Sequence, residues 1–241
     1  MLKNFLIVIP ARYKSSRLPG KPLIKIMGVP MLIRTYTQCR KVTSKKNIII
    51  ATDDKRISNL CLKNKIPFIK TSKKCLTGTD RVAEVAKKKK AKIYINVQGD
   101  EPVFNPKDLR KIIDHSKKNT NKILNGFTKI IDKKQFLSSN IPKVVFRNDG
   151  RLLYMSRAAI PITKKKKFVK AWRQVCIYSY PYKALMAFSS NKKKTKLERI
   201  EDCELIRFLE LGYDVKMISM SNKSISVDTK EDLIKVNKIL S

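Results

Sequence analysis

The sequence lacks the marks of a membrane or exported protein. Its 241 residues contain no apolar run of about 18 residues, the length that crosses a bilayer. The short apolar segment at residues 1–10 leads directly into Ala11 and Arg12, without the small residues that mark a signal-peptide cleavage site. We therefore expect a buried first strand, no membrane insertion and a cytoplasmic protein.

Cysteine and histidine are also scarce. The five cysteines are odd in number and no two have a CxxC spacing, which argues against a zinc site or a disulfide framework. We expect free, buried or half-buried thiols at Cys39, Cys61, Cys75, Cys176 and Cys203. The single histidine, His115, follows Asp114 in a predicted helix and is expected to be a surface residue without a catalytic role.

Acidic residues are few beside the basic ones. The chain has 19 Asp and Glu against 55 Lys and Arg, which gives a net charge of +36. Such a charge is typical of nucleic-acid binding, but a general bias toward lysine gives the same number. The basic runs at 87–90, 164–167 and 192–194 contain no interleaved aromatic residues and are typical of solvated loops and helix ends. We therefore expect no specific nucleic-acid partner, although a basic surface would attract anionic substrates.

The order of apolar segments predicts the fold class. With 42% hydrophobic residues, the chain has enough apolar surface for one sizeable core. Strand-like runs at 5–9, 47–51, 66–69 and 93–97 alternate with helical patterns through the first half. This alternation predicts an α/β fold with a doubly wound, mostly parallel sheet. Ligands bind at the carboxyl ends of the strands in such sheets, so the polar loops that follow the strands should converge.

Capping residues and amphipathic patterns place the helices. We expect helices to begin at 28–30, after the cluster 52–54, at Thr79-Asp80 and at Asn105-Pro106. One long amphipathic helix is expected over 197–211, ended by Gly212, and a last helix over 228–240.

The second half reads differently from the first. Strand-like segments at 123–131, 143–146, 152–155 and 175–180 dominate, with a turn signal at 148–150. They predict a smaller β-rich lobe over about 123–195. Because no linker interrupts the chain, we expect a single domain over 1–241 from which this lobe grows.

Three loops after predicted strands carry groups that suit phosphates and metal. Residues 10–21 hold four cations, two serine hydroxyls and a glycine, which can surround a triphosphate, although a merely solvated loop is common and a Walker A pattern is absent. Gly78 between two threonines suits either close approach to a ligand or a helix cap. Asp100 lies where a Mg²⁺ ligand would meet phosphates, with a capping role as the alternative.

A fourth acidic position lies far along the chain. Thr229 and Asp232 resemble a capping box, so this segment has a structural function. Asp228 precedes the cap and is free to point elsewhere. Since Mg²⁺ needs few protein carboxylates when phosphates complete its shell, Asp100 and Asp228 together would suffice.

Together these strings resemble the 3-deoxy-manno-octulosonate (KDO) cytidylyltransferase family. The matching motifs cover nearly the whole chain, at residues 9–23, 51–53, 78–81, 96–102, 155–161 and 227–229. Sialic-acid cytidylyltransferases share the fold but lack the Arg-Leu-Pro-Gly-Lys-Pro run found at 17–22. The resemblance implies a GT-A/Rossmann-like nucleotidyltransferase that joins CMP from CTP to an acidic 3-deoxy sugar, KDO, for lipopolysaccharide biosynthesis. It also implies a Mg²⁺ cofactor and a homodimer.

The resemblance further implies roles for individual residues. It places catalysis on Lys21, Arg17 and Asp100, and Mg²⁺ on Asp100 and Asp228. The nucleotide would be bound by Pro10, Ala11, Arg12, Arg17, Lys21, Thr79, Arg81 and Gln98. The sugar would be bound by Arg157, which would face its carboxylate, and by Gln174, Tyr178 and Glu204.

The chain departs from the family pattern mainly where the family binds its sugar. Cys75 and Gln174 replace histidines, Leu205 replaces a glutamine, and Cys176 and Ser179 stand where the family has glycines. The same reaction on another acidic or amino-substituted ulosonic sugar is therefore an alternative. A basic binding module without catalysis is a further one, and the intact triphosphate and metal motifs argue against it.

Overall fold

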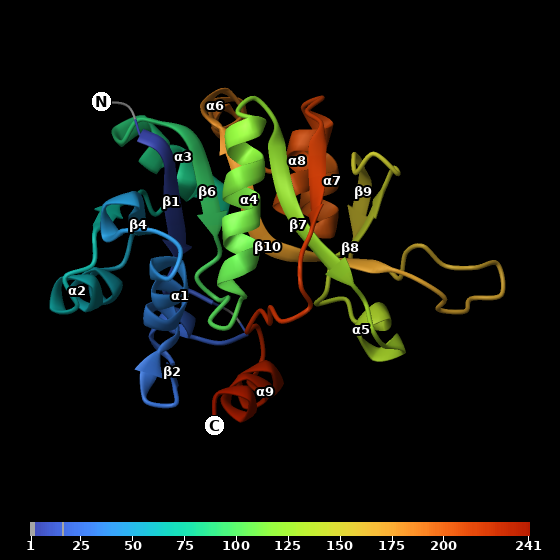
Figure 1. The fold of residues 1–241 in the computed structure, drawn as a ribbon, viewed down its shortest axis with the longest axis horizontal. Helices are drawn as coiled ribbons and strands as arrows, with labels where there is room; N and C mark the ends of the chain where they lie inside the picture. The colour runs from blue at the N-terminus through green and yellow to red at the C-terminus, as the bar shows by residue number, and fades with distance from the viewer. Residues whose placement is uncertain (1–2, 16) are drawn as a thin grey trace.

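One large sheet organises the molecule (Figure 1). The computed structural model describes residues 3–15 and 17–241, so Ser16 of the first basic loop lies outside the described part. In that part, the main strand order is β11-β7-β10-β6-β1-β4-β5, and β8 and β9 lie off this path, with β8 paired to β10. The strands are β1 Lys3–Ala11, β4 Ile48–Thr52, β5 Phe68–Lys70, β6 Ala91–Val97, β7 Ile123–Lys129, β8 Lys143–Phe146, β9 Leu152–Ser156, β10 Trp172–Pro181 and β11 Val215–Ser219.

Most neighbouring strands on the main path run parallel. β1 is parallel to β4 and β6, β4 to β5, and β11 to β7, whereas β10 is antiparallel to β6 and β7. A short ladder of β2 (Lys25–Ile26) and β3 (Val29–Pro30) precedes the first helix. The helices are α1 Met31–Arg40, α2 Lys55–Lys63, α3 Gly78–Lys88, α4 Pro106–Lys118, α5 Lys133–Leu137, α6 Tyr182–Ser190, α7 Lys196–Glu201, α8 Glu204–Glu210 and α9 Lys230–Leu240.

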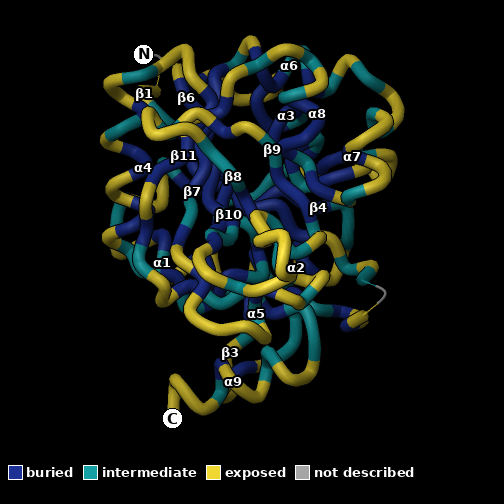
Figure 2. Tube along the Cα trace, turned by 90° about the vertical axis from the view of Figure 1, so that its right-hand side faces the viewer, coloured by how far each residue is buried: buried dark blue, intermediate teal, exposed yellow. Residues whose placement is uncertain are grey.

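The alternation of side chains along β1 explains the two layers of helices. Leu6 and Val8 pack into a core with apolar residues of α3, α6 and α8, whereas Ile7 and Ile9 pack into a second core with α1, α2 and α4. A strand buried on both faces needs a continuous apolar run, as this one has. Figure 2 shows buried segments gathered in the centre of the body and exposed segments toward its periphery. The predicted doubly wound α/β class is confirmed.

Side-chain caps start several helices where the sequence indicates them. The side chains of Asp54 and Asn105 accept hydrogen bonds from backbone N–H groups in the first turns of α2 and α4. The predicted cap of α3 at Thr79-Asp80 is two residues late, because Thr77 is the cap, forms a reciprocal capping box with Asp80, and the helix begins at Gly78. Thr79 therefore lies within the first turn and is fully buried.

The range 123–195 contributes both to the main sheet and to its side branch. β7 and β10 lie inside the main sheet, whereas β8 and β9 form an antiparallel extension from the outer half of β10. The segment between β9 and β10 projects from the body as a long exposed loop (Figure 1). The β-rich lobe thus shares strands with the sheet that carries the first half of the chain.

The prediction of one long helix over 197–211 is wrong. The structure has two short helices, α7 and α8, separated by Asp202 and Cys203, and the backbone of Asp202 is left-handed with φ 47° and ψ 46°. A single non-glycine residue in this conformation ends an α-helix, and amphipathic periodicity does not reveal it because both halves keep their apolar faces. Gly212 has a positive φ of 79° just after α8, as expected of a residue that follows a helix.

The last helix packs on a small core of its own. Thr229 and Asp232 form the predicted capping box of α9, which is confirmed. Val236 of α9 is buried with Leu18, Ile26 and Val227, near the first basic loop. Among the described helices, none has the length and apolar character needed to cross a membrane.

Candidate active site

A cavity of about 1150 Å³ lies at the carboxyl ends of β1 and β6. All residues predicted for the site line it except Thr79, which is buried behind its wall. The convergence follows from topology, because β1 and β6 are adjacent and parallel and therefore deliver their following loops to one edge. The particular role predicted for each lining residue stays a prediction.

Lys21 joins two carboxylates from distant parts of the chain. Its Nζ donates to Oδ2 of Asp100 at 2.5 Å and to Oδ1 of Asp228 at 2.9 Å. Arg17 donates to the same oxygen of Asp228 at 3.0 Å and to Asn140 at 2.8 Å. Burial of the Lys21 ammonium disfavours its charge, but the two carboxylates outweigh burial and raise the pKa of Lys21 above its usual value.

Local backbone features place Lys21 at this point. Gly20 has a left-handed φ of 67°, and its N–H donates to the carbonyl of Tyr13. A side chain at this position would be strained, so glycine suits the turn. Asp100 lies in the loop that follows β6, and its carbonyl accepts from the N–H of Val227, which brings Asp228 beside it.

The pair of Asp100 and Asp228 fits a divalent cation. Both side chains are partly exposed to the cavity, and a protein cation, the Lys21 ammonium, already bridges them. Carboxylate oxygens are the ligands that Mg²⁺ prefers, and it takes few of them when phosphates supply the rest. The described residues contain no group of three or more His, Cys, Asp or Glu that would hold a metal alone.

Two glycines allow the walls of the nucleotide side to pack tightly. A Cβ at Gly78 would lie 2.8 Å from Nε2 of Gln98 and 3.2 Å from Cγ of Pro10, and one at Gly99 would lie 2.9 Å from the Pro10 carbonyl oxygen. The approach to the Pro10 carbonyl leaves no room for a side chain at Gly99. Gly78 fits closely against Gln98 and Pro10, which themselves line the cavity.

The first backbone N–H groups of α3 already have a partner. Oε1 of Glu204 accepts from the N–H of Gly78 at 3.0 Å, and Oε2 accepts from the N–H and Oγ1 of Thr79 at 2.9 and 2.5 Å. Thr79 also bonds the Tyr180 hydroxyl at 3.2 Å. Both oxygens of the predicted sugar ligand Glu204 are thus used within the protein. Burial raises the pKa of Glu204, although the bonds from Thr79 and Gly78 oppose this shift.

Arg81 and Arg157 are held by similar protein contacts. Arg81 pairs with Asp53 at 3.2 Å and donates to the Thr71 hydroxyl and the Ser72 carbonyl. Arg157 donates from Nε to the Glu201 carbonyl at 2.7 Å, from Nη1 to the Ser139 carbonyl at 2.9 Å and from Nη2 to the Asp202 carbonyl at 3.0 Å. These three bonds leave two of the five guanidinium N–H groups of Arg157, and Nη2 also lies 3.8 Å from Oδ2 of Asp202.

The departures from the family pattern divide into two sets. Gln174 and Cys176 of β10 line the cavity, so they lie where they would meet a substrate. Cys75 donates instead to Glu84 at 3.2 Å, Leu205 is fully buried in the apolar core, and Ser179 is buried outside the cavity lining. Only the first set changes the described cavity lining directly.

Several lining residues were missed by the sequence reasoning. Glu101 is buried next to Asp100, and burial raises its pKa to about 7, although a hydrogen bond from the Ser224 hydroxyl opposes the shift. Lys194 and Asp202 form an ion pair that also lines the cavity. Glu101 belongs to the motif at 96–102, and its position next to Asp100 could have identified it. The pair of Lys194 and Asp202 depends on the break between α7 and α8, which the sequence did not predict.

The fold and the cavity define a nucleotidyltransferase. A family model described as cytidylyltransferase matches residues 6–224. The chain is 33% identical to the mitochondrial 3-deoxy-manno-octulosonate cytidylyltransferase of Arabidopsis thaliana, over 97% of this chain and 82% of that protein. It is 36% identical to the 3-deoxy-manno-octulosonate cytidylyltransferase of Fusobacterium nucleatum, over 97% of this chain and 95% of that protein.

Solved structures agree with these relatives. The structure of a CMP-2-keto-3-deoxy-manno-octonic acid synthetase in complex with CTP has a TM-score of 0.89 and 31% identity, and covers 99% of this chain and 98% of its own. A cytidylyltransferase from Leptospira borgpetersenii, at 15% identity, shares the fold with a TM-score of 0.62 over 99% of this chain and 94% of its own. The chain therefore belongs to the 3-deoxy-manno-octulosonate cytidylyltransferase family, which confirms the resemblance seen in its motifs.

Proposed function

We propose that this protein transfers CMP from CTP to KDO and releases pyrophosphate. The observation that carries the proposal is the convergence of Arg17, Lys21, Asp100 and Asp228 at one point of the cavity, in a chain of this family. The anomeric oxygen of the sugar would bond to the α-phosphorus of CTP, and the bond from that phosphorus to the pyrophosphate oxygen would break. No covalent intermediate with the protein is needed, so positioning and charge neutralisation supply the catalysis.

The cations of the first loop would hold the triphosphate. Lys21 and Arg17 are tied to the cavity wall by carboxylates, so they need little reorganisation to meet a developing negative charge. Arg12 lines the same cavity from the start of this loop. Pro10, Gln98 and Gly78 pack against one another and would form a rigid surface for the cytidine.

Asp100 and Asp228 would hold Mg²⁺. When bound, the ion would polarise the α-phosphate and favour ionisation of the sugar hydroxyl. We expect activity to be lost on chelation with EDTA and restored by added Mg²⁺. Activity that survives exhaustive chelation would contradict this assignment.

The sugar would lie toward Arg157 and β10. The two N–H groups of Arg157 outside its three backbone bonds suit a carboxylate. Gln174 and Tyr178 line the same side of the cavity. Because Gln174 and Cys176 differ from the family pattern, the same reaction on a related acidic or amino-substituted ulosonic sugar is the second candidate.

We also propose a homodimer. Large apolar side chains are exposed on α5, β9 and their neighbouring loops, namely Ile131, Leu137, Leu153, Ile162 and Val169. Exposed apolar side chains in such number suit a surface that another subunit covers. Sedimentation or light scattering tests the dimer, and the cytoplasmic location stays a prediction.

Pyrophosphate release tests the function directly. Purified protein is incubated with Mg²⁺, one nucleoside triphosphate and one acidic sugar from a panel that includes KDO and amino-substituted ulosonic sugars. We expect turnover with CTP and KDO, and much slower turnover with ATP or GTP. Equal rates with all nucleotides, or turnover of another sugar but not KDO, would overturn the proposal in its present form.

A further inference from the structure

The break between α7 and α8 brings three consecutive residues, Asp202, Cys203 and Glu204, to the cavity, directly after Glu201. We call residues 201–204 the elbow. Asp202 holds the left-handed conformation that separates the two helices, and its side chain, like those of Cys203 and Glu204, lines the cavity. Glu201 lies on the side of β9 and Glu204 on the side of α3.

The Glu204 end of the elbow holds the start of α3. Its two carboxylate oxygens accept from the N–H groups of Gly78 and Thr79 and from the Thr79 hydroxyl. A carboxylate at this position complements the partial positive charge of a helix N terminus. Gly78 in turn packs on Gln98 and Pro10, so the position of Glu204 sets the wall that would receive the nucleotide.

The Glu201 end of the elbow holds Arg157. Oε1 of Glu201 accepts from the Ser156 hydroxyl at 2.6 Å, and Oε2 accepts from the Arg157 N–H at 2.8 Å. The carbonyls of Glu201 and Asp202 accept from the Arg157 guanidinium. The direction of Arg157 in the cavity therefore depends on the elbow backbone and on Glu201.

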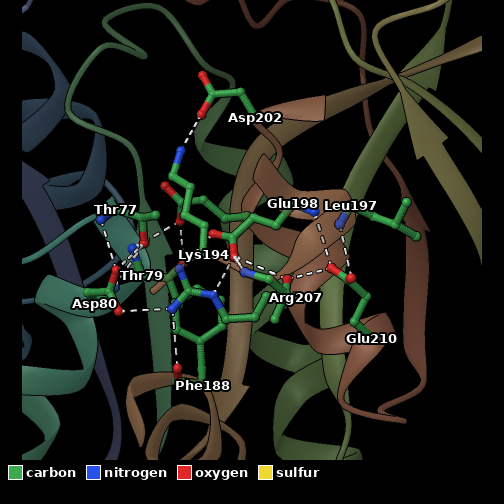
Figure 3. Close-up of polar contacts among 12 residues, drawn as sticks. Thr77, Thr79, Asp80, Phe188, Lys194, Leu197, Glu198, Asp202, Arg207 and Glu210 are labelled. Atoms are coloured by element: carbon green, nitrogen blue, oxygen red, sulfur yellow. Dashed lines mark hydrogen bonds and ion pairs between the residues drawn. The ribbon is translucent and has the colours of Figure 1, made fainter. Parts of the chain in front are cut away.

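A buried ion network links the two helices beside the elbow to the start of α3. Arg207 of α8 donates from Nε and Nη2 to the two carboxylate oxygens of Glu198 of α7, both at 2.6 Å. It also donates to Asp80 of the α3 capping box at 3.2 Å (Figure 3). The fully buried guanidinium of Arg207 thus connects α7, α8 and the start of α3.

We propose that the elbow is a positioning unit for both substrates, in which Glu204 positions the nucleotide wall at Gly78 and Glu201 positions Arg157 for the acidic sugar. The proposal rests on the proposed function for the identity of the two substrates. Neither glutamate needs to touch a substrate to act in this way. The assignment replaces the direct sugar contact expected of Glu204 by an indirect contribution on the nucleotide side.

The test separates the two ends of the elbow. The dissociation constant of CTP is measured by titration calorimetry, and the KM for KDO by pyrophosphate release at saturating CTP. We expect Glu204→Gln to weaken CTP about 10-fold with little change in the sugar KM, and Glu201→Gln to raise the sugar KM about 10-fold with little change in CTP binding. A merely structural role would move the melting temperature alone.

Glu210→Gln is the matched control. Glu210 of α8 also accepts from backbone N–H groups at a helix start, those of Leu197 and Glu198 at 3.0 and 3.1 Å, and it does not belong to the cavity lining (Figure 3). We expect this variant to lower the melting temperature while both substrate constants stay at wild-type values. If the glutamine variants do not fold, Thr79→Val and Ser156→Ala each remove one bond of the same glutamates and should give smaller changes in the same directions.

Two results would overturn the proposal. Unchanged CTP affinity in both Glu204→Gln and Thr79→Val would show that the start of α3 does not set nucleotide binding. A rise in the sugar KM alone for Glu204→Gln would make Glu204 a sugar ligand. Failure of the proposed function appears separately, as absence of turnover by the wild-type protein with KDO, and leaves the CTP titrations interpretable.

Discussion

Two cations of this protein are each bound by two carboxylates, and their surroundings differ. Lys21 meets Asp100 and Asp228 at the cavity, where the side chains of the three residues retain 15 to 23% exposure. Arg207 meets Glu198 and Asp80 in the core, where Arg207 is fully buried and Glu198 nearly so. The cluster around Lys21 is thus open to ligands, whereas the cluster around Arg207 is closed to them.

Hydrogen bonding makes the same distinction. The Arg207 guanidinium satisfies Glu198 with two parallel bonds and adds bonds to Asp80 and the Phe188 carbonyl (Figure 3). The bonds of the Lys21 ammonium to Asp100 and Asp228 leave it one further donor, and both carboxylates have oxygens facing the cavity. A fully buried network suits positioning, whereas a partly exposed one suits exchange with phosphate and metal.

The largest expected effect is on stability, from Arg207→Met. The change leaves the buried Glu198 carboxylate without its partner, and breaking a buried ion pair on one side costs about 3–5 kcal/mol. Denaturant unfolding of the two proteins measures the difference in free energy. The double variant with Glu198→Gln should recover part of the loss because no unpaired charge remains. A loss below about 1 kcal/mol in the single variant would show that the network contributes little.

The next effect is on catalysis, from Asp100→Asn or Asp228→Asn. We expect each to lower kcat at least about 10²-fold, because a charge that stabilises the transition state is lost. The melting temperature should change little, since both side chains lie at the cavity edge. Asp149→Asn is the control, because Asp149 is an exposed carboxylate paired with Arg147. Near-full activity with lowered stability in Asp228→Asn would instead indicate a capping role.

The strands and the polar site were predictable because local patterns determine them. Continuous apolar runs marked the strands of the first half, and parallel topology then required the loops with Lys21 and Asp100 to share an edge. Asp228 was identified because Thr229 and Asp232 already explained the helix cap, which left Asp228 available. The structure brings all three side chains together.

The elbow and its contacts were not predictable in the same way. The apolar periodicity of 197–211 continues through the break, since Leu205, Ile206 and Phe208 of α8 are all buried. The carbonyl of Asp202, the residue with the left-handed backbone, accepts from Arg157, which lies far away in sequence. The Glu204 bond to Gly78 spans 126 positions, and no local pattern predicts such a pair.

Lys143 can be compared with Lys21 and Arg207, because it is a buried cation whose partners are backbone carbonyls and not carboxylates. Its Nζ donates to the carbonyls of Ser138 and Arg157 at 2.8 and 2.6 Å. Burial, with a smaller contribution from the Arg157 charge, lowers the pKa of Lys143 from 10.5 to about 8. Above pH 8 the folded state loses this proton while the unfolded state keeps it, so the free energy of unfolding should rise with pH up to about 10.5.

The comparison of wild type with Lys143→Met isolates this contribution. Between about pH 8 and pH 9 the wild type should gain about 1 kcal/mol relative to the variant, within the limit of about 1.4 kcal/mol per pH unit for one proton. Urea unfolding at both pH values measures the difference. A gain of the opposite sign would mean that the folded state favours the charged form of Lys143.

The smallest expected effect on function concerns the surface lysines, since 19 acidic residues cannot balance 55 basic ones. If the positive charge reflects only a general bias toward lysine, the protein should bind duplex DNA only through the DNA phosphates. Binding should then show no sequence preference and should fall steeply as the salt concentration rises. Turnover should be unchanged at a salt concentration where the DNA has dissociated. Fluorescence anisotropy with two unrelated duplexes over a salt series measures the binding. Binding that persists at about 0.5 M salt, or that separates the two sequences, would require base contacts and would give these lysines a role of their own.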